Sequence, residues 1–190
     1  MILKEQTVGY SAFTGTVFPR MSLPQRALCR WATLEEYDRV LDMDCGDGAL
    51  LGGLDSGLRL TLCGLCDSPE QARTTRDALE NADVTYARPG DIPFRDASFD
   101  VLFDAGHVEK LCSREELSEA LRVLRPGGQL LAACRPFGNW GVGAGEGALD
   151  RRSLMRRLQE AGFCQVSFRR HGLVGVVVAW KKASLAQNKN

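Results

Sequence analysis

The chain has 190 residues, of which 44% are apolar and 25% charged, and its formal net charge is zero. These values are typical of one globular domain, and they exclude a disordered chain, a collagen-like repeat and a coiled coil. The longest apolar stretch, residues 172–180, is too short for a membrane helix, and residues 1–15 lack the layout of a signal peptide, so we expect a cytoplasmic protein without membrane association.

Short apolar runs alternate with amphipathic stretches, which predicts an α/β fold with a mostly parallel sheet and helices on both faces. Ser68 and Pro69 form a typical helix start, and Pro126 with two following glycines is typical of a helix end. The expected elements up to residue 134 are helix 23–37, strand 39–43, helix 49–54, strand 59–66, helix 69–81, strands 84–87 and 99–103, helix 115–124 and strand 129–134.

The last third of the chain predicts a loop, a helix and a hairpin. Residues 136–150 contain five glycines, which indicates a loop, either a substrate lid or a surface linker. A helix at 153–161 follows, and the runs 164–170 and 173–180 are separated by only two residues, which predicts an antiparallel hairpin.

Charge is distributed unevenly along the chain. Residues 1–150 hold 15 Lys and Arg against 23 Asp and Glu, whereas residues 151–190 hold 9 against 1. Four arginines between residues 151 and 157 are typical of a solvated helix face, although they could attract an acidic partner. Nucleic acid is disfavoured as that partner, because no aromatic residues alternate with these charges.

Seven cysteines at irregular spacing predict free thiols rather than a disulfide pattern. Cys63 and Cys66 form a C-x-x-C pair, but they fall in an expected strand, where residues three apart point to opposite faces. No second pair supplies the remaining ligands of a zinc site. We therefore expect neither a metal site nor a redox role for this C-x-x-C pair.

Residues 42–48, Asp-Met-Asp-Cys-Gly-Asp-Gly, follow the first expected strand. Gly46 and Gly48 permit a tight turn in which a ligand approaches backbone N–H groups. The G-x-G-x-x-G fingerprint of nicotinamide enzymes is incomplete here, and no P-loop is present. The loop alone is therefore a weak signal.

Taken with four further motifs, this loop resembles the class I S-adenosylmethionine-dependent methyltransferases, particularly their small-molecule branch and the type 11-like domain. The five motifs lie in the family's order at residues 40–48, 64–70, 91–100, 121–131 and 161–163. The resemblance covers about residues 38–182 and implies a Rossmann-like fold, a seven-stranded sheet with an antiparallel C-terminal strand. Residues 1–37 would then be an N-terminal helical segment or lid, and residues 183–190 a polar tail.

The resemblance also implies S-adenosylmethionine as cofactor and S-adenosylhomocysteine as product. Asp42 would orient the amino-acid end of the cofactor, the two loop glycines would form the turn, Asp91 would meet the adenine amino group and Ile92 would pack on the ring. The full expected cofactor set is Asp42, Asp44, Cys45, Gly46, Gly48, Cys66, Asp67, Asp91, Ile92 and Asp104.

Two positions depart from the family pattern. Asp44 stands where the family usually has glycine, and Cys66 stands where it usually has an acidic residue that binds the ribose. A thiol is a poor acceptor, so we expect weaker cofactor binding, with Asp67 as a substitute only if the strand ends before it. Restoring glycine at 44 and aspartate at 66 would greatly raise the affinity if the site has decayed, and would change it little if the site has compensated.

Methyl transfer depends mainly on alignment of donor and acceptor, with a base only where the acceptor carries a proton. His107 and Glu109 are the candidate bases. No motif for nucleobase methylation follows the fourth expected strand, which favours a small-molecule acceptor. The alternatives are a catalytically degenerate methyltransferase-like binding or scaffold protein, and another nucleotide-dependent α/β enzyme.

Overall fold

The computed structural model describes residues 21–55, 58–88, 90–105, 113–134, 151–172 and 174–184. Its elements in chain order are α1 (Leu23–Trp31), β1 (Arg39–Asp42), α2 (Ala49–Leu54), β2 (Thr61–Cys66), α3 (Pro69–Ala78), β3 (Ala82–Tyr86), β4 (Phe99–Asp104), α4 (Arg114–Val123), β5 (Leu124–Cys134), α5 (Arg151–Ala161), β6 (Phe163–His171) and β7 (Val174–Lys181). The segment 1–20, the glycine-rich loop 136–150 and residues 185–190 lie outside the described residues.

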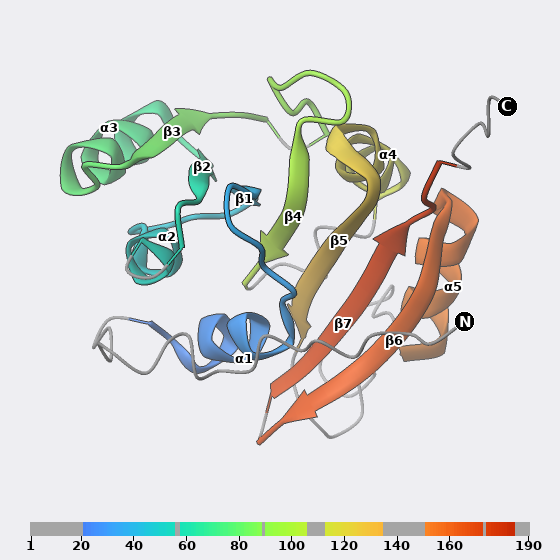
Figure 1. The fold of residues 1–190 in the computed structure, drawn as a ribbon. Helices are drawn as coiled ribbons and strands as arrows, with labels where there is room; N and C mark the ends of the chain where they lie inside the picture. Colours follow the sequence, from blue (N-terminus) through green and yellow to red (C-terminus); the bar gives the residue numbers. More distant parts are fainter. Residues whose placement is uncertain are drawn as a thin grey trace, which may run out of the picture.

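The seven described strands form one sheet in the order β3-β2-β1-β4-β5-β7-β6 (Figure 1). The strands β1 to β5 pair in parallel, whereas β7 pairs antiparallel with both β5 and β6. The predicted α/β class, the mostly parallel sheet and the antiparallel terminal hairpin are therefore confirmed. The order reverses at β1, whose neighbours are β2 and β4, and such a reversal is where open α/β sheets bind ligands.

Helices cover both faces of this sheet (Figure 1). On one face α1, α2 and α3 bury apolar side chains that include Leu28, Leu50 and Ala72. On the other face α4 and α5 bury Leu117 and Leu158. Burial of each large aliphatic side chain contributes about 1.5–3 kcal/mol, so these two layers fix the positions of the strand ends that form the candidate site.

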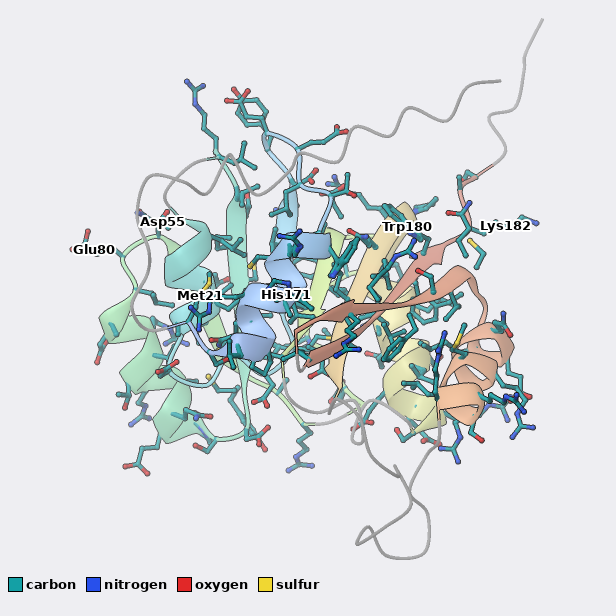
Figure 2. All side chains as sticks on the ribbon, turned by 90° about the horizontal axis from the view of Figure 1, so that it is seen from below. Met21, Asp55, Glu80, His171, Trp180 and Lys182 are labelled. Carbon is teal, nitrogen blue, oxygen red and sulfur yellow. The ribbon has the colours of Figure 1, made fainter. Side chains whose placement is uncertain are left out.

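Side-chain caps start three of the described helices, including the one predicted at Ser68. The hydroxyl oxygens of Ser22, Ser68 and Ser113 accept hydrogen bonds from the backbone N–H groups three residues later. Met21, just before the first cap, lies beside α2 (Figure 2), where its thioether fills the space next to Gly53. These contacts hold the start of α1 against α2.

The predicted end of the first helix, at residue 37, is wrong. Helix α1 ends at Trp31, and the chain beyond it is held by the buried side chain of Gln129 on β5. The Gln129 amide nitrogen donates to the Trp31 carbonyl at 3.3 Å, and the Thr33 N–H donates to the Gln129 side-chain oxygen at 3.0 Å. This anchor comes from a residue almost 100 positions away, which local periodicity does not reveal.

Strand β5 starts at Leu124 rather than at residue 129. Helix α4 does end just before Pro126, but the chain enters the strand at once. Its pairing with β4 shifts register between Phe99 and Val101, which accommodates the turn-forming residues. The other predicted boundaries differ from the structure by at most three residues, because helix ends and edge strands carry weak local signals.

The basic end of the chain forms an exposed face. All four arginines of α5 are exposed, Arg151 stacks on Phe168, and Arg156 lies 3.8 Å from Glu160. The prediction of a solvated helix face is confirmed. None of the helices that the structure describes is long and apolar enough to span a membrane.

Candidate cofactor site

The site is built from the carboxyl ends of the three central strands. Asp42 ends β1, Cys66 ends β2 and Asp104 ends β4, and β1 lies between the other two strands. Because these strands are parallel, their carboxyl ends meet at one edge of the sheet. The structure therefore brings together the predicted residues of the loop 42–48 and of the neighbouring strand ends.

Backbone hydrogen bonds fasten the loop after β1 to both neighbouring strands. The Met43 N–H donates to the Phe103 carbonyl of β4 at 2.8 Å, and the Cys45 N–H donates to the Leu65 carbonyl of β2 at 2.9 Å. The Gly48 N–H closes the turn on the Cys45 carbonyl at 2.7 Å. The loop is thus a rigid extension of the sheet.

The two glycines of the loop serve different purposes. Gly48 has a φ of +78°, and a Cβ there would lie 2.6 Å from a methyl carbon of Leu79, so a side chain would strain the backbone and force Leu79 to shift. Gly46 has a φ of +52°, and a Cβ there would meet no atom of the described part of the chain within 4 Å. Thr75 donates its hydroxyl to the Gly46 carbonyl at 2.6 Å, which fixes the open turn. The backbone at Gly46 is therefore available for the close approach of a ligand.

Asp42 is fully buried at the base of this loop. One of its carboxylate oxygens accepts a 3.4 Å hydrogen bond from the Asp44 N–H, and the other has no hydrogen-bond partner among the described residues. Burial raises the pKa of Asp42 to about 8, and the negative charges of Asp104, Asp44 and Asp47 act in the same direction, whereas the Asp44 N–H lowers it. An organic cation at this oxygen would supply the missing partner and stabilise the carboxylate.

Asp47 has a structural role in the loop. Its side chain accepts a hydrogen bond from the Ala49 N–H at 3.0 Å, at the start of α2, where Gly48 occupies the N-cap position without a side chain. This bond satisfies one of the donors that a helix start leaves open. This capping role of Asp47 is not among the sequence predictions, although an aspartate two residues before a helix is a recognisable signal.

The side chain of Cys66, at the position where the family usually has the acidic ribose ligand, packs against the loop after β1. It is buried, and its sulfur lies 3.1 Å from the Cys45 sulfur and 4.0 Å from the Gly46 carbonyl oxygen. Asp67 is exposed, and because β2 ends at Cys66, it lies beyond the strand. The strand alternation that weighed against Asp67 as a ribose ligand therefore does not apply to it.

Asp91 and Ile92 lie on the loop between β3 and β4. Asp91 is exposed, and Ile92 is buried in the core under α4. The Arg122 guanidinium holds this loop by donating to the Ile92 and Phe94 carbonyls at 2.9 and 2.8 Å and to the Asp96 carboxylate.

The partner of Arg122 on α4 completes this clamp. Glu119 accepts hydrogen bonds from Arg122 at 2.6 and 2.7 Å and from the Ile92 N–H at 3.0 Å. The hydrogen bond from Arg122 holds the pKa of Glu119 below its ordinary value. Sequence reasoning missed both residues, since nothing in the order of residues links a helix at 114–123 to a loop about 30 positions earlier.

Asp104 is buried at the end of β4, next to the Asp42 site. The two predicted candidate bases, His107 and Glu109, lie outside the described residues. Among the residues that are described, no three His, Cys, Asp or Glu side chains are grouped so that they could hold a metal ion.

Comparison with known proteins agrees with this geometry. Residues 41–132 match a family model described as a methyltransferase domain. The 27-O-demethylrifamycin SV methyltransferase of Amycolatopsis mediterranei (strain S699) is 33% identical over 104 residues, which cover 51% of this chain and 38% of that protein. The chain spans about two fifths of the length of the curated relatives that it matches.

Solved structures share the fold. A S-adenosylmethionine-dependent methyltransferase from Aquifex aeolicus has a TM-score of 0.69 and 21% identity, covering 83% of this chain and 88% of that one. The cyclase SpnF has a TM-score of 0.68 and 17% identity, covering 84% and 80%. Residues 41–132 thus match a methyltransferase domain, and the chain has the fold of class I S-adenosylmethionine-dependent methyltransferases.

Proposed function

We propose that the protein binds S-adenosylmethionine at the loop after β1 and transfers its methyl group to a small-molecule acceptor. The observation that carries this proposal is the buried, unpartnered carboxylate oxygen of Asp42 beside the open turn at Gly46. S-adenosylmethionine carries an ammonium group and a sulfonium, so it supplies positive charge for the Asp42 carboxylate. It also needs close approach to the backbone, which the turn at Gly46 permits. When bound, it supplies an electrophilic methyl group.

Each of the chain's own residues then has a defined task. Asp42 accepts hydrogen bonds from the ammonium group, and Asp104, Asp44 and Asp47 add a negative field that favours a cationic ligand. Asp67, beyond the end of β2, takes the ribose hydroxyls in place of Cys66. Asp91 binds the adenine amino group.

The transfer itself is an in-line displacement that requires alignment and exclusion of water rather than many catalytic groups. His107 and Glu109 are the proposed bases for an acceptor that carries a proton. A small acceptor is supported by the named substrate type of the Amycolatopsis relative and by the absence of a nucleobase-methylation motif after Asp104.

The alternative is a methyltransferase-like protein that has lost catalysis and serves as a binding or scaffold module. The observation that favours it is the burial of Cys66 against Cys45, which leaves β2 without its usual acidic terminus. The fold does not decide between the two, since the cyclase SpnF shares it.

A matched pair of glycine substitutions tests cofactor binding at the loop. Gly46 and Gly172 have φ values of +52° and +58°, and at either position a Cβ meets none of the residues that the structure describes within 4 Å. Gly46→Ala and Gly172→Ala therefore carry a similar backbone cost, about 1 kcal/mol. Only Gly46→Ala places a methyl group in the proposed cofactor space. We expect it to weaken S-adenosylmethionine binding at least tenfold, measured by calorimetric titration.

Gly172→Ala, at the β6–β7 turn, is the control and should bind the cofactor like the wild type. Thermal melting of both variants checks that their stabilities match. Equal cofactor affinity in the two variants would contradict the placement of the cofactor at Gly46.

A further inference from the structure

The two cysteines beneath the cofactor loop form a close pair of thiols. Cys45 lies in the loop and Cys66 ends β2, and their sulfur atoms are 3.1 Å apart. Their residues are only 1% and 2% exposed. Both are free thiols in the structure, and a disulfide needs the sulfurs to approach to about 2.05 Å, a shift of about 1 Å.

The surrounding backbone holds this pair in place. The Cys45 N–H donates to the Leu65 carbonyl at 2.9 Å, so the loop is hydrogen-bonded to the residue before Cys66. A Cβ on Gly64 would lie 2.9 Å from the Cys45 sulfur, so the missing side chain at 64 makes room for this thiol. The contact is thus a packed feature of the loop and the strand.

The partner of Cys66 is not the one that the C-x-x-C spacing suggests. Cys63 belongs to the core on the face of the sheet that α4 and α5 cover, whereas Cys66 packs on the opposite face with Cys45. A bond between Cys63 and Cys66 would have to pass through the strand. The structure therefore pairs residues 21 positions apart that no sequence motif links.

We propose that Cys45 and Cys66 are a redox-active pair, which a peroxide converts to an intramolecular disulfide that ties the cofactor loop to the end of β2. In the first step one thiol breaks the peroxide O–O bond and becomes a sulfenic acid, releasing water or an alcohol. In the second step the other sulfur attacks it, the S–S bond forms, the S–O bond breaks and water leaves. Each peroxide thus oxidises two thiols by two electrons, and a thiol reductant reverses the change.

The environment of the pair sets the rate of this reaction. Burial, the contact with Cys66 and the charge of Asp42 raise the pKa of the Cys45 thiol. Because the thiolate is the nucleophile, oxidation should be slow at neutral pH and should accelerate as the pH rises.

The test uses the wild-type protein, incubated with hydrogen peroxide at pH 7 and pH 9, alkylated under denaturing conditions and mapped by peptide mass spectrometry. We expect a Cys45–Cys66 crosslink, a mass loss of two hydrogens, faster formation at pH 9 and full reversal by dithiothreitol. The crosslinked protein should also melt at a higher temperature, because the bond closes a loop of about 20 residues. A crosslink at other cysteines, or over-oxidation without any crosslink, would overturn the proposal.

Two matched variants sharpen the result. Cys66→Ala should abolish the crosslink, whereas Cys63→Ala, on the same strand but the opposite face, should leave it intact. Loss of the crosslink in both variants would contradict the pairing. None of these readouts needs the cofactor, so a failure of S-adenosylmethionine binding and a failure of the thiol pair are separate results.

Discussion

Asp42 is the residue on which the candidate site depends most. It combines full burial, an unpartnered oxygen and three neighbouring carboxylates, an arrangement that is unfavourable for the folded protein alone. Such a group is typical of a binding site, where a ligand of opposite charge compensates for the cost. The prediction from sequence that this residue orients a cationic group is consistent with that environment.

The raised pKa of Asp42 predicts a pH dependence of stability. Its pKa is about 8 in the folded protein against an ordinary value of 3.8, so between these values the folded state holds a proton that the unfolded state has lost. This contribution is fully present below pH 4 and is lost as the pH rises to about 8. Asp42→Asn stays uncharged at every pH, so the variant avoids the cost of ionising this buried carboxyl group as the pH rises. We expect the variant to be more stable than the wild type at pH 8.5, by about 1–3 kcal/mol, with a smaller gain at pH 5.

Urea unfolding of both proteins at the two pH values checks this expectation. The difference in unfolding free energy between the two proteins separates the contribution of Asp42 from those of the other carboxyl groups. A difference in unfolding free energy that stays constant across pH 5–8.5 would mean that the pKa of Asp42 is not raised in the folded protein.

Asp42 also predicts how cofactor affinity varies with pH. An ammonium group binds the ionised carboxylate, so protonation of Asp42 competes with binding. We expect wild-type affinity for S-adenosylmethionine to rise at least threefold between pH 6.5 and pH 8.5, measured by calorimetric titration. A second titration of Asp42→Asn should show weak binding with little change over this range. A wild-type affinity that falls with pH would contradict the role of Asp42.

Cys66 shows how the structure changes an interpretation from sequence. The resemblance to the family suggests that aspartate at this position would restore a ribose ligand. Because the Cys66 side chain is buried against Cys45, the substitution would place a carboxylate between the loop and β2 without a cationic partner. Asp67, exposed beyond the strand, is the better candidate for this task.

At the scale of elements, α4 controls the loop that carries Asp91. The guanidinium of Arg122 makes hydrogen bonds to two loop carbonyls and two carboxylates, with its side chain 29% exposed. Arg122→Lys removes the planar guanidinium group, whose several N–H donors these contacts require. We expect this substitution to lower the free energy of unfolding by about 2–3 kcal/mol. It should also weaken cofactor binding, because the loop loses its anchor.

Arg125→Lys is the matched control for this clamp. Arg125 contacts one carboxylate, that of Asp100, and its side chain is 46% exposed, so we expect a loss below about 1 kcal/mol and unchanged cofactor affinity. Urea unfolding and calorimetric titration of both variants measure the two effects. Similar losses of stability in the two variants would show that the clamp is no more important than a surface ion pair.

The elements themselves could largely be predicted from sequence, because caps and apolar periodicity are local. Helix α2 has the predicted bounds, and Ser68 caps α3 as expected. The failures have a common physical cause. Gln129 ends α1, Arg122 holds the loop at 91–96 and Cys45 meets Cys66 through contacts between residues 21 to 98 positions apart. Such contacts arise from packing and leave no periodic signal.

At the scale of the whole molecule, the sheet order creates the site. The strand reversal at β1 brings together three strand ends that are distant in sequence, and the two helical layers hold them. The motif order predicted this arrangement through the resemblance to the family. It did not predict the packing of Cys66 or the clamp on the loop, because these depend on contacts between side chains of different motifs, which the order of the motifs does not reveal.

The most direct measurement is a calorimetric titration of the purified, folded protein with S-adenosylmethionine and, separately, with S-adenosylhomocysteine. We predict a single site that binds S-adenosylmethionine with a micromolar Kd, which corresponds to a binding free energy of about −8 kcal/mol. Absence of binding up to millimolar cofactor, with folding verified by circular dichroism, would contradict the proposed activity and favour a binding or scaffold role for this methyltransferase fold.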